Sequence, residues 1–188
     1  LIYENNSGYG YHNPADDVEA RAAVLAAAEY EGPVYLRFGR LAVPRFNDPE
    51  NYNFEIGKGI EMADGSDVTI IATGLMVNEA MIAKDMLKEE GISARVINIH
   101  TIKPIDKDII LKAAKETGAL VTAEEHNVIG GLGSAVAEVV CEEYPVPVVK
   151  VGVEDKFSAS GPAVEMLKIY GLCASNIVEK AKKAISMK

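Results

Sequence analysis

The sequence of 188 residues has few cysteines, no long apolar run and no excess of basic residues, and each absence argues against a class of protein. Its two cysteines, Cys141 and Cys173, stand far apart along the chain. Zinc sites and disulfide-rich domains need several closely spaced cysteines. We therefore interpret both side chains as buried structural thiols.

No apolar run approaches the roughly 20 residues that a membrane-spanning helix requires. The start of the sequence, Leu1 to Glu4, also lacks the basic flank of a signal peptide. The formal net charge is −9, whereas proteins that bind nucleic acids use basic surfaces to neutralise phosphates. The sequence therefore predicts a cytoplasmic protein that binds neither a membrane nor a nucleic acid.

From residue 68 onward, short β-branched runs alternate with segments of helical period. They predict strands at residues 68–72, 95–99, 120–123 and 148–151, after an edge strand at 54–62 that contains two glycines. One helix should bury a stripe made of Met76, Ala80, Ala83 and Leu87. Such alternation requires crossover connections, so we expect an α/β domain whose mostly parallel sheet is covered by helices on both faces.

The beginning of the chain contains too few elements for a complete domain. The first twelve residues show no sustained period and are predicted to be a loop. Asn13 is placed to cap a helix that begins at Pro14, and Val34 to Phe38 has the composition of a strand. One helix and one strand cannot bury their apolar faces alone, so these residues look like the end of a domain.

The sequence also predicts where two further helices begin and how the chain divides into domains. Asp106 is placed to cap the helix that follows Pro104, and Ser175 the last helix. We predict a partial domain at residues 1–46, a linker at 47–56 and a complete domain at 57–188.

Residues 118–140 place a charged cluster and glycines between a predicted strand and a predicted helix, a position where open α/β sheets bind ligands. The cluster is Glu124, Glu125 and His126, and the glycines are Gly130, Gly131 and Gly133. The spacing fits neither the dinucleotide fingerprint nor a P-loop. The glycines suit close packing of helix on strand. Alternatively, the first helical turn is open to an anion, or to Glu124 or Glu125 folding back on its N–H groups.

Four charged or titratable side chains are candidates for chemistry. His126 stands beside two carboxylates, Glu124 and Glu125, and suits acid/base catalysis or a subunit interface. His100 is interpreted as a structural residue, and His12 falls in the irregular start. Arg40, just beyond a predicted strand, suits a phosphate or carboxylate ligand or a surface salt bridge. No spacing typical of a serine hydrolase or a zinc enzyme occurs.

Several motifs together resemble the C-terminal section of transketolase, especially of enzymes that are split into two polypeptides. They are GSDVTIIATGLMV, ARVINIHTIKPID, VTAEEHNVIGGLGSAVAE and FSASGPAVEMLKIYGL. The resemblance runs from Asn13 to the end of the chain. NPADDVEARAAVLAAAEYEGPVYLRFGR is similar to the last helix and strand of the family's pyrimidine-binding domain.

The resemblance implies a transferase that depends on thiamine diphosphate and a divalent metal, Mg or Ca, and moves a two-carbon ketol unit between sugar phosphates. It implies a homodimer and a partner, the N-terminal subunit that carries the pyrophosphate-binding domain. The C-terminal domain of the family has a mixed five-stranded sheet with an antiparallel first strand, and serves mainly in assembly. Arg40 matches the family arginine that holds the substrate phosphate.

The family's Asp-Gly-Pro-Thr-His segment, cofactor-activating glutamate and metal motif are missing. We therefore expect no catalytic and no metal-binding residue here, no cofactor bound by this chain alone, and no activity without a partner. One alternative is a non-catalytic assembly module in which Glu124, Glu125, His126, Gly130 and Gly131 order a loop at a subunit contact. Another is the equivalent domain of 1-deoxyxylulose 5-phosphate synthase or of a 2-oxoacid dehydrogenase β subunit.

Overall fold

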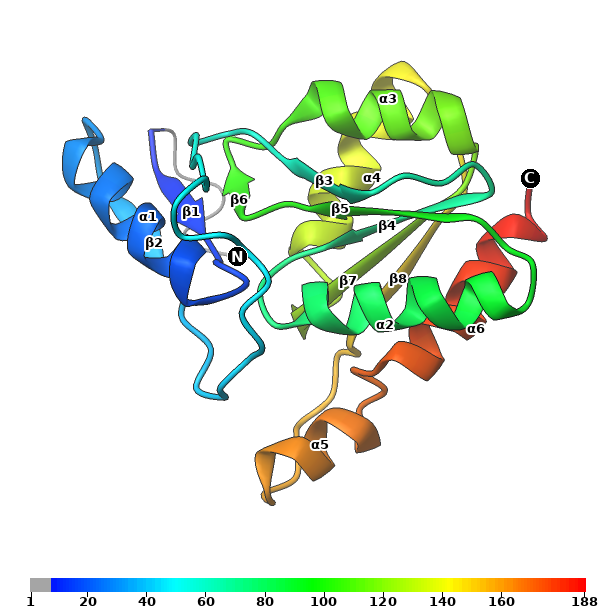
Figure 1. Ribbon diagram of the computed structural model, residues 1–188. Helices are drawn as coiled ribbons and strands as arrows, with labels where there is room; N and C mark the ends of the chain where they lie inside the picture. Colours follow the sequence, from blue (N-terminus) through cyan, green and yellow to red (C-terminus); the bar gives the residue numbers. More distant parts are fainter. Residues whose placement is uncertain (1–7) are drawn as a thin grey trace.

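A five-stranded sheet with strand order β3-β5-β4-β7-β8 forms the centre of the protein, as the computed structural model shows for residues 8–188 (Figure 1). The strand β3 pairs antiparallel with β5, and the other three pairings are parallel. The predicted α/β class with a mixed, mostly parallel sheet is therefore confirmed. The strands are β3 (Ile60–Ala63), β4 (Val68–Ala72), β5 (Ala94–Asn98), β7 (Leu120–Asn127) and β8 (Val148–Val153).

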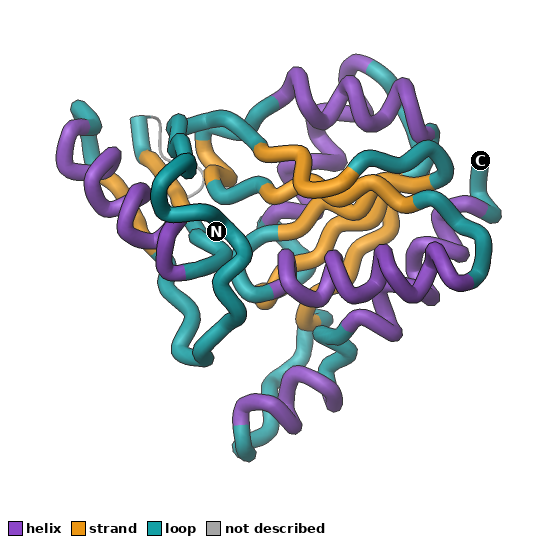
Figure 2. Tube along the Cα trace, in the orientation of Figure 1, coloured by secondary structure: helices purple, strands orange, loops and turns teal. Residues whose placement is uncertain are grey.

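Helices cover both faces of this sheet and give the domain three layers (Figure 2). On one face lie α2 (Met76–Glu89) and α6 (Ala174–Ile185), and on the other lie α3 (Lys107–Thr117) and α4 (Leu132–Glu143). Successive strand residues point to opposite faces, so Ile70 belongs to the first core and Ile71 to the second. The predicted stripe of α2 is confirmed, because all four of its side chains are fully buried.

The N-terminal residues form a second, three-stranded sheet with strand order β2-β1-β6. Its strands are β1 (Gly10–His12), β2 (Val34–Leu36) and β6 (Thr101–Lys103), and α1 (Asp17–Glu29) packs beside it. Because β6 belongs to the later part of the chain and pairs antiparallel with β1, the two parts share a sheet. The predicted loop is wrong at residues 10–12, since three residues are too few to show a period; residues 1–7 lie outside the described part.

Two helices begin at residues other than those that the local sequence predicts. The N-cap of α1 is Asp16, whose Oδ1 accepts the N–H of Glu19 at 2.9 Å, whereas Asn13 donates its N–H to the carbonyl of His100. The last helix, α6, begins after Cys173 instead of Ser175. Asp106 caps α3 as predicted.

Three further expectations need correction. The edge strand is shorter than residues 54–62, because only Ile60–Ala63 pairs with β5. Phe54 lies outside the strand, and the centroid of its ring is 4.2 Å from that of the His100 ring. The strand β7 continues to Asn127, so the charged cluster lies in a strand and not in a loop. The interpretation of both cysteines as buried is wrong, because Cys141 is exposed and Cys173 only half-buried.

Residues 154–170, which we call the arm, connect β8 to α6 and extend away from the three layers (Figure 1). The arm contains the short helix α5 (Ala163–Ile169), none of whose residues is buried. Among residues 8–188, no helix has the length and apolar composition to cross a membrane.

Candidate functional site

The carboxylate of Glu124 organises the glycine loop and the start of α4. The Glu124 side chain extends from β7 and is almost fully buried. Its two carboxylate oxygens accept hydrogen bonds from the N–H groups of Leu132 at 2.8 Å and Gly133 at 2.9 Å. These N–H groups have no partner within the helix, and a carboxylate also interacts favourably with the helix dipole. The alternative in which Glu124 folds back on the helix is confirmed, so these two N–H groups are already occupied.

The glycines allow this close approach. A Cβ atom on Gly131 would lie 2.0 Å from Oε2 of Glu124, and one on Gly133 would lie 2.7 Å from Oγ1 of Thr122. Gly130 adopts a left-handed conformation with φ of 75° and donates its N–H to Ser134 Oγ at 2.9 Å. Close packing of helix on strand therefore explains Gly131 and Gly133, as one of the two interpretations predicted.

The other members of the charged cluster make contacts outside the glycine loop. The side chain of Arg37 contacts Glu125 twice, donating to its backbone carbonyl at 2.9 Å and lying 3.6 Å from its carboxylate. His126 is half-buried, and its Nδ1 lies 3.4 Å from the carbonyl of Asn127. Arg37 was missed by sequence reasoning because its partner is 88 positions away along the chain. The structure thus brings Glu125 to the N-terminal segment, but not His126.

Arg40 lies in the loop that follows β2, and its side chain is exposed. Within residues 8–188 it takes part in no hydrogen bond or ion pair, so its five donors are available to a ligand. The structure does not bring Arg40 together with the charged cluster through any contact. It stands beside a hollow of about 570 Å³, lined in part by its neighbours Gly39 and Leu41.

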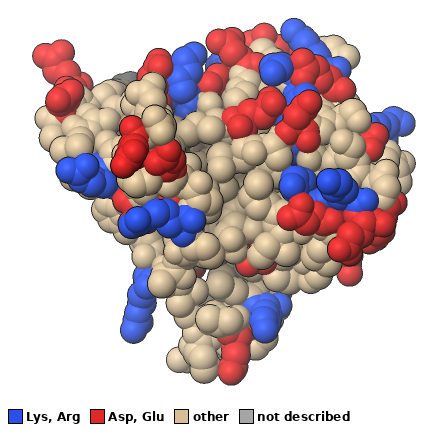
Figure 3. Space-filling model, viewed as in Figure 1, with Lys and Arg blue, Asp and Glu red and all other residues tan. Residues whose placement is uncertain are grey.

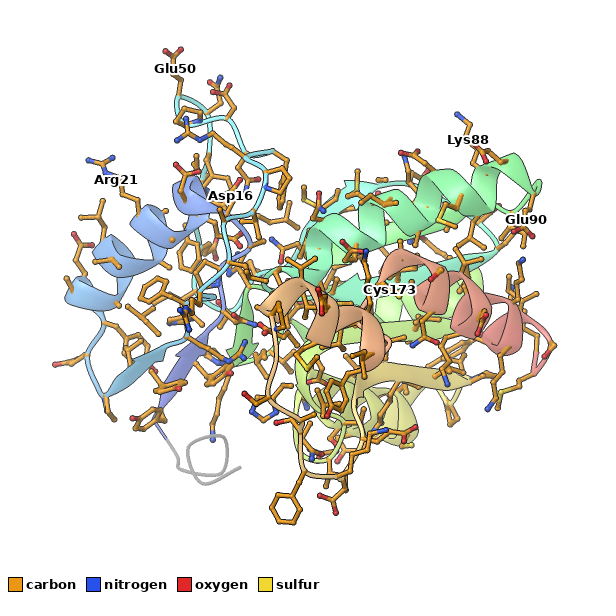
Figure 4. All side chains as sticks on the ribbon, turned by 90° about the horizontal axis from the view of Figure 1, so that it is seen from below. Asp16, Arg21, Glu50, Lys88, Glu90 and Cys173 are labelled. Carbon is orange, nitrogen blue, oxygen red and sulfur yellow. The ribbon has the colours of Figure 1, made fainter. Side chains whose placement is uncertain are left out.

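The loop that carries Arg40 is held against the start of α1. Oδ2 of Asp16 accepts the backbone N–H groups of Phe46 and Asn47 at 3.1 and 2.9 Å, and Arg45 pairs with Asp17. Burial alone would raise the pKa of Asp16, but the N–H groups that it accepts outweigh this and lower it. Figure 4 shows Asp16 at the junction between α1 and this loop, while Arg21 points away from the protein.

A second carboxylate, Glu19, joins three segments in the interior. Its Oε1 accepts hydrogen bonds from Asn98 Nδ2 at 2.9 Å and from the Tyr52 hydroxyl, and its Oε2 accepts the N–H of Ala15 at 2.6 Å. The side chain is fully buried, and this burial raises its pKa. Since all these contacts are internal, Glu19 has a structural position between α1 and the five-stranded sheet.

The raised pKa of Glu19 predicts a specific pH dependence. At a pH between 4.5, the ordinary pKa of this carboxyl group, and its raised pKa in the folded state, the folded protein holds a proton that the unfolded chain releases. The contribution of Glu19 to the free energy of unfolding is thus largest below about pH 4.5 and is lost as pH rises through the folded-state pKa. We expect Glu19→Gln, which does not titrate, to become more stable relative to wild type as pH increases.

Urea unfolding at several pH values measures this difference. Glu50→Gln is the matched control, because Glu50 is exposed and contacts the solvent (Figure 4). A free-energy difference between wild type and Glu19→Gln that stays constant from about pH 4 to 7 would contradict the raised pKa.

Two buried histidines share one hydroxyl group. Nδ1 of His12 lies 3.1 Å and Nδ1 of His100 2.9 Å from Oγ1 of Thr101. Neither Nε2 atom has a hydrogen-bond partner within residues 8–188. Burial lowers the pKa of His12 to about 4. Burial lowers that of His100 to about 4 as well, helped by the charge of His12 and opposed by Asp106. Both rings are therefore neutral at pH 7, and the predicted structural location of His100 agrees with its burial.

The described residues contain no group that resembles a metal site. In residues 8–188, no three His, Cys, Asp or Glu side chains lie close enough together to hold a metal ion. On the face drawn in Figure 3, acidic and basic side chains are interspersed. The described residues therefore offer the exposed guanidinium of Arg40 and the buried carboxylate of Glu124 at the start of α4.

Residues 57–177, which are most of the chain, match the C-terminal domain of transketolase. The chain belongs to the transketolase C-terminal domain family. A solved structure described as "Split gene transketolase, inactive beta4 tetramer" superposes on this chain with a TM-score of 0.93 and 47% identity, and covers all of this chain and 60% of that one. Enzymes of the transketolase family depend on thiamine diphosphate.

Two curated relatives show how widely this domain occurs. The 6-deoxy-6-sulfo-D-fructose transketolase subunit SqwH of Clostridium sp. (strain MSTE9) is 43% identical over 187 residues, which are all of this chain and 58% of that protein. The 1-deoxy-D-xylulose-5-phosphate synthase of Heliobacterium modesticaldum is 41% identical over 172 residues, or 90% of this chain and 27% of that protein. The chain thus spans little more than half of the first relative and about a quarter of the second.

Proposed function

We propose that this chain is the C-terminal part of a thiamine diphosphate-dependent transketolase that transfers a two-carbon ketol unit between sugar phosphates. The observation that carries the proposal is the match of the complete chain, at 43% and 47% identity, to subunits described as transketolase or split transketolase. The partner that completes the enzyme is an N-terminal subunit with the pyrophosphate-binding domain. The protein acts in the cytoplasm.

Residues 1–46 are the end of a pyrimidine-binding domain, residues 47–56 a linker and residues 57–188 the C-terminal domain. The contact of Arg37 with Glu125 and the shared strand β6 support a fixed arrangement of the first part on the last. Copies of this chain associate with each other, at least as a homodimer; the solved relative described as a beta4 tetramer supports this.

Thiamine diphosphate and its metal, Mg or Ca, are held by the assembled enzyme and not by this chain. The buried carboxylates described above do not fit the cofactor, because Glu19 and Glu124 already accept hydrogen bonds on both oxygens. No step of the reaction is therefore assigned to them. The role of this chain lies in assembly and in binding the substrate phosphate.

The test combines this chain with a polypeptide that supplies the pyrophosphate-binding and remaining pyrimidine-binding parts, and follows ketol transfer from xylulose 5-phosphate. We expect turnover by the mixture and none by either component. Tight binding of thiamine diphosphate by this chain alone, measured by calorimetry, would contradict the proposal.

Arg40 is proposed to bind the phosphate of the substrate. Its exposed guanidinium has no internal partner within residues 8–188, and a planar fork of donors matches phosphate oxygens. In the reconstituted enzyme, Arg40→Met is expected to raise the KM for a phosphorylated sugar about 10-fold to 100-fold, because a charged hydrogen bond contributes roughly 1.5–3 kcal/mol.

Arg21→Met is the matched control, since Arg21 is an exposed arginine on the outer side of α1 (Figure 4). Its KM should equal that of wild type. If Arg40→Met leaves the KM unchanged, another residue holds the phosphate.

A second candidate function is the equivalent part of 1-deoxyxylulose 5-phosphate synthase, which the 41% identity to such an enzyme favours. The reconstituted mixture distinguishes the two activities by its product. Formation of 1-deoxyxylulose 5-phosphate would support the synthase, whereas ketol transfer between sugar phosphates supports the transketolase. We favour the latter, because the transketolase subunit matches this chain over its whole length.

A further inference from the structure

The arm exposes large apolar side chains that the chain itself does not cover. Phe157 is 103% exposed, Ile169 66% and Val164 57%, and the arm extends away from the sheet and its helices (Figures 1 and 2). Single exposed apolar residues are common, but several on one projecting segment are typical of a contact surface.

The glycine loop approaches the base of the arm at Val128. A hollow of about 330 Å³ is lined both by Val128 of that loop and by Ile169 and Tyr170 of the arm, and the next residue, Ile129, is 53% exposed. We name the four side chains the arm surface. It consists of Ile129, Phe157, Val164 and Ile169.

The arm is held in place by contacts at its base. The Tyr170 hydroxyl accepts the N–H of Ala159 at 2.6 Å, Leu172 donates its N–H to the carbonyl of Leu167 at 2.8 Å, and Leu167 packs against the apolar core. A surface that is already ordered loses less conformational entropy on binding than a loose segment would. The arm is therefore suited to recognise a partner of defined shape.

The charge of the arm suits association between like chains. The whole chain has a net charge of −9, so two copies repel each other through most of their surface. The arm carries three acidic and two basic side chains and is close to neutral. Apolar contact at the arm therefore joins two copies where their mutual repulsion is small.

We propose that the arm surface is the contact through which a second copy of this chain binds. In a two-fold dimer the same patch of both copies meets, so each arm surface packs against that of the other copy. The inference rests on the proposed self-association, and it names the surface responsible. The solved relative supports a like chain as the occupant, because it has the same fold over this entire chain and is described as a beta4 tetramer.

The test measures the mass of this chain by sedimentation velocity over a range of concentrations. Wild type is expected to form dimers or larger assemblies. The double variant Phe157→Asp, Ile169→Ser is expected to weaken self-association at least about 10-fold, since removing central apolar contacts typically has effects of this size. Both side chains are exposed, so circular dichroism should show the wild-type fold.

Leu25→Asp is the matched control, because Leu25 is 58% exposed but lies on α1, outside the arm surface. It should associate as wild type does. Assembly of the double variant at the wild-type concentration would overturn the inference, and so would a wild type that stays monomeric throughout. Ketol transfer by the reconstituted mixture is measured separately. If the wild-type chain self-associates but the mixture shows no ketol transfer, the result counts against the proposed function alone.

Discussion

Replacing Gly131 with alanine is expected to lower the free energy of unfolding by about 3 kcal/mol, because the added methyl group displaces a buried carboxylate. The Cβ atom would lie 2.0 Å from Oε2 of Glu124 and 3.1 Å from the carbonyl oxygen of Asn127, so the Glu124 side chain must leave its hydrogen-bonded position to make room. Displacing Glu124 breaks its hydrogen bonds to Leu132 and Gly133. The start of α4 then loses its acceptor, and a buried charge loses its donors.

Chemical denaturation of wild type and variant measures this difference in the free energy of unfolding. In thermal unfolding, the melting temperature of the variant should be about 10 °C lower than that of wild type. Gly39→Ala provides the matched control, because a Cβ atom at Gly39 meets nothing within 4 Å and its φ does not lie in the left-handed region. Its stability should remain within about 0.5 kcal/mol of wild type. Equal stabilities for Gly131→Ala and Gly39→Ala would show that the loop relaxes freely, contrary to the observed packing.

The second large expected effect is a loss of stability at acidic pH. The free energy of unfolding should fall by about 3 kcal/mol between pH 7 and pH 5, because the unfolded chain binds protons there that the folded chain does not. Burial lowers the pKa of His12 and of His100 from 6.5 to about 4. Their contribution to stability is complete above pH 6.5 and is lost as pH falls toward 4. The contribution of Glu19 has the opposite sign in this range and reduces the total.

Asparagine variants test the assignment to the two histidines. The Asn side chain places an amide close to the position of Nδ1, the atom that contacts Thr101, but it does not titrate. Each of His12→Asn and His100→Asn should remove roughly half of the fall in stability, and the double variant should remove most of it. A double variant as sensitive to acid as wild type would assign the effect to other groups.

The elements that sequence predicted well are those whose signal is local. The strands β4 and β5 are fully buried and contain several β-branched side chains, and the stripe of α2 repeats at helical spacing. The short strands β1 and β6 were not predicted, because their pairing joins residues about 90 positions apart. The start of α6 was misplaced for the same reason, since the N–H of Ala174 donates to Glu79 of α2.

The candidate site was only partly accessible from sequence. The return of Glu124 to the start of α4 was one of several open alternatives, and choosing it requires knowing that β7 continues to Asn127. Arg37 gives no signal at all without its partner. The assignment of Arg40 to a phosphate, and of His126 to a subunit contact, stay predictions.

The strand β6 and the Glu19 carboxylate have a practical consequence for building chimeras within the family. A designer who exchanges modules at the apparent linker, residues 47–56, would cut between β1 and the strand that pairs with it, and between Glu19 and its donor Asn98. Such a hybrid would have to rebuild both contacts from sequences that did not evolve together. A crossover upstream of Gly10 keeps the shared sheet and the Glu19 contacts within one parent.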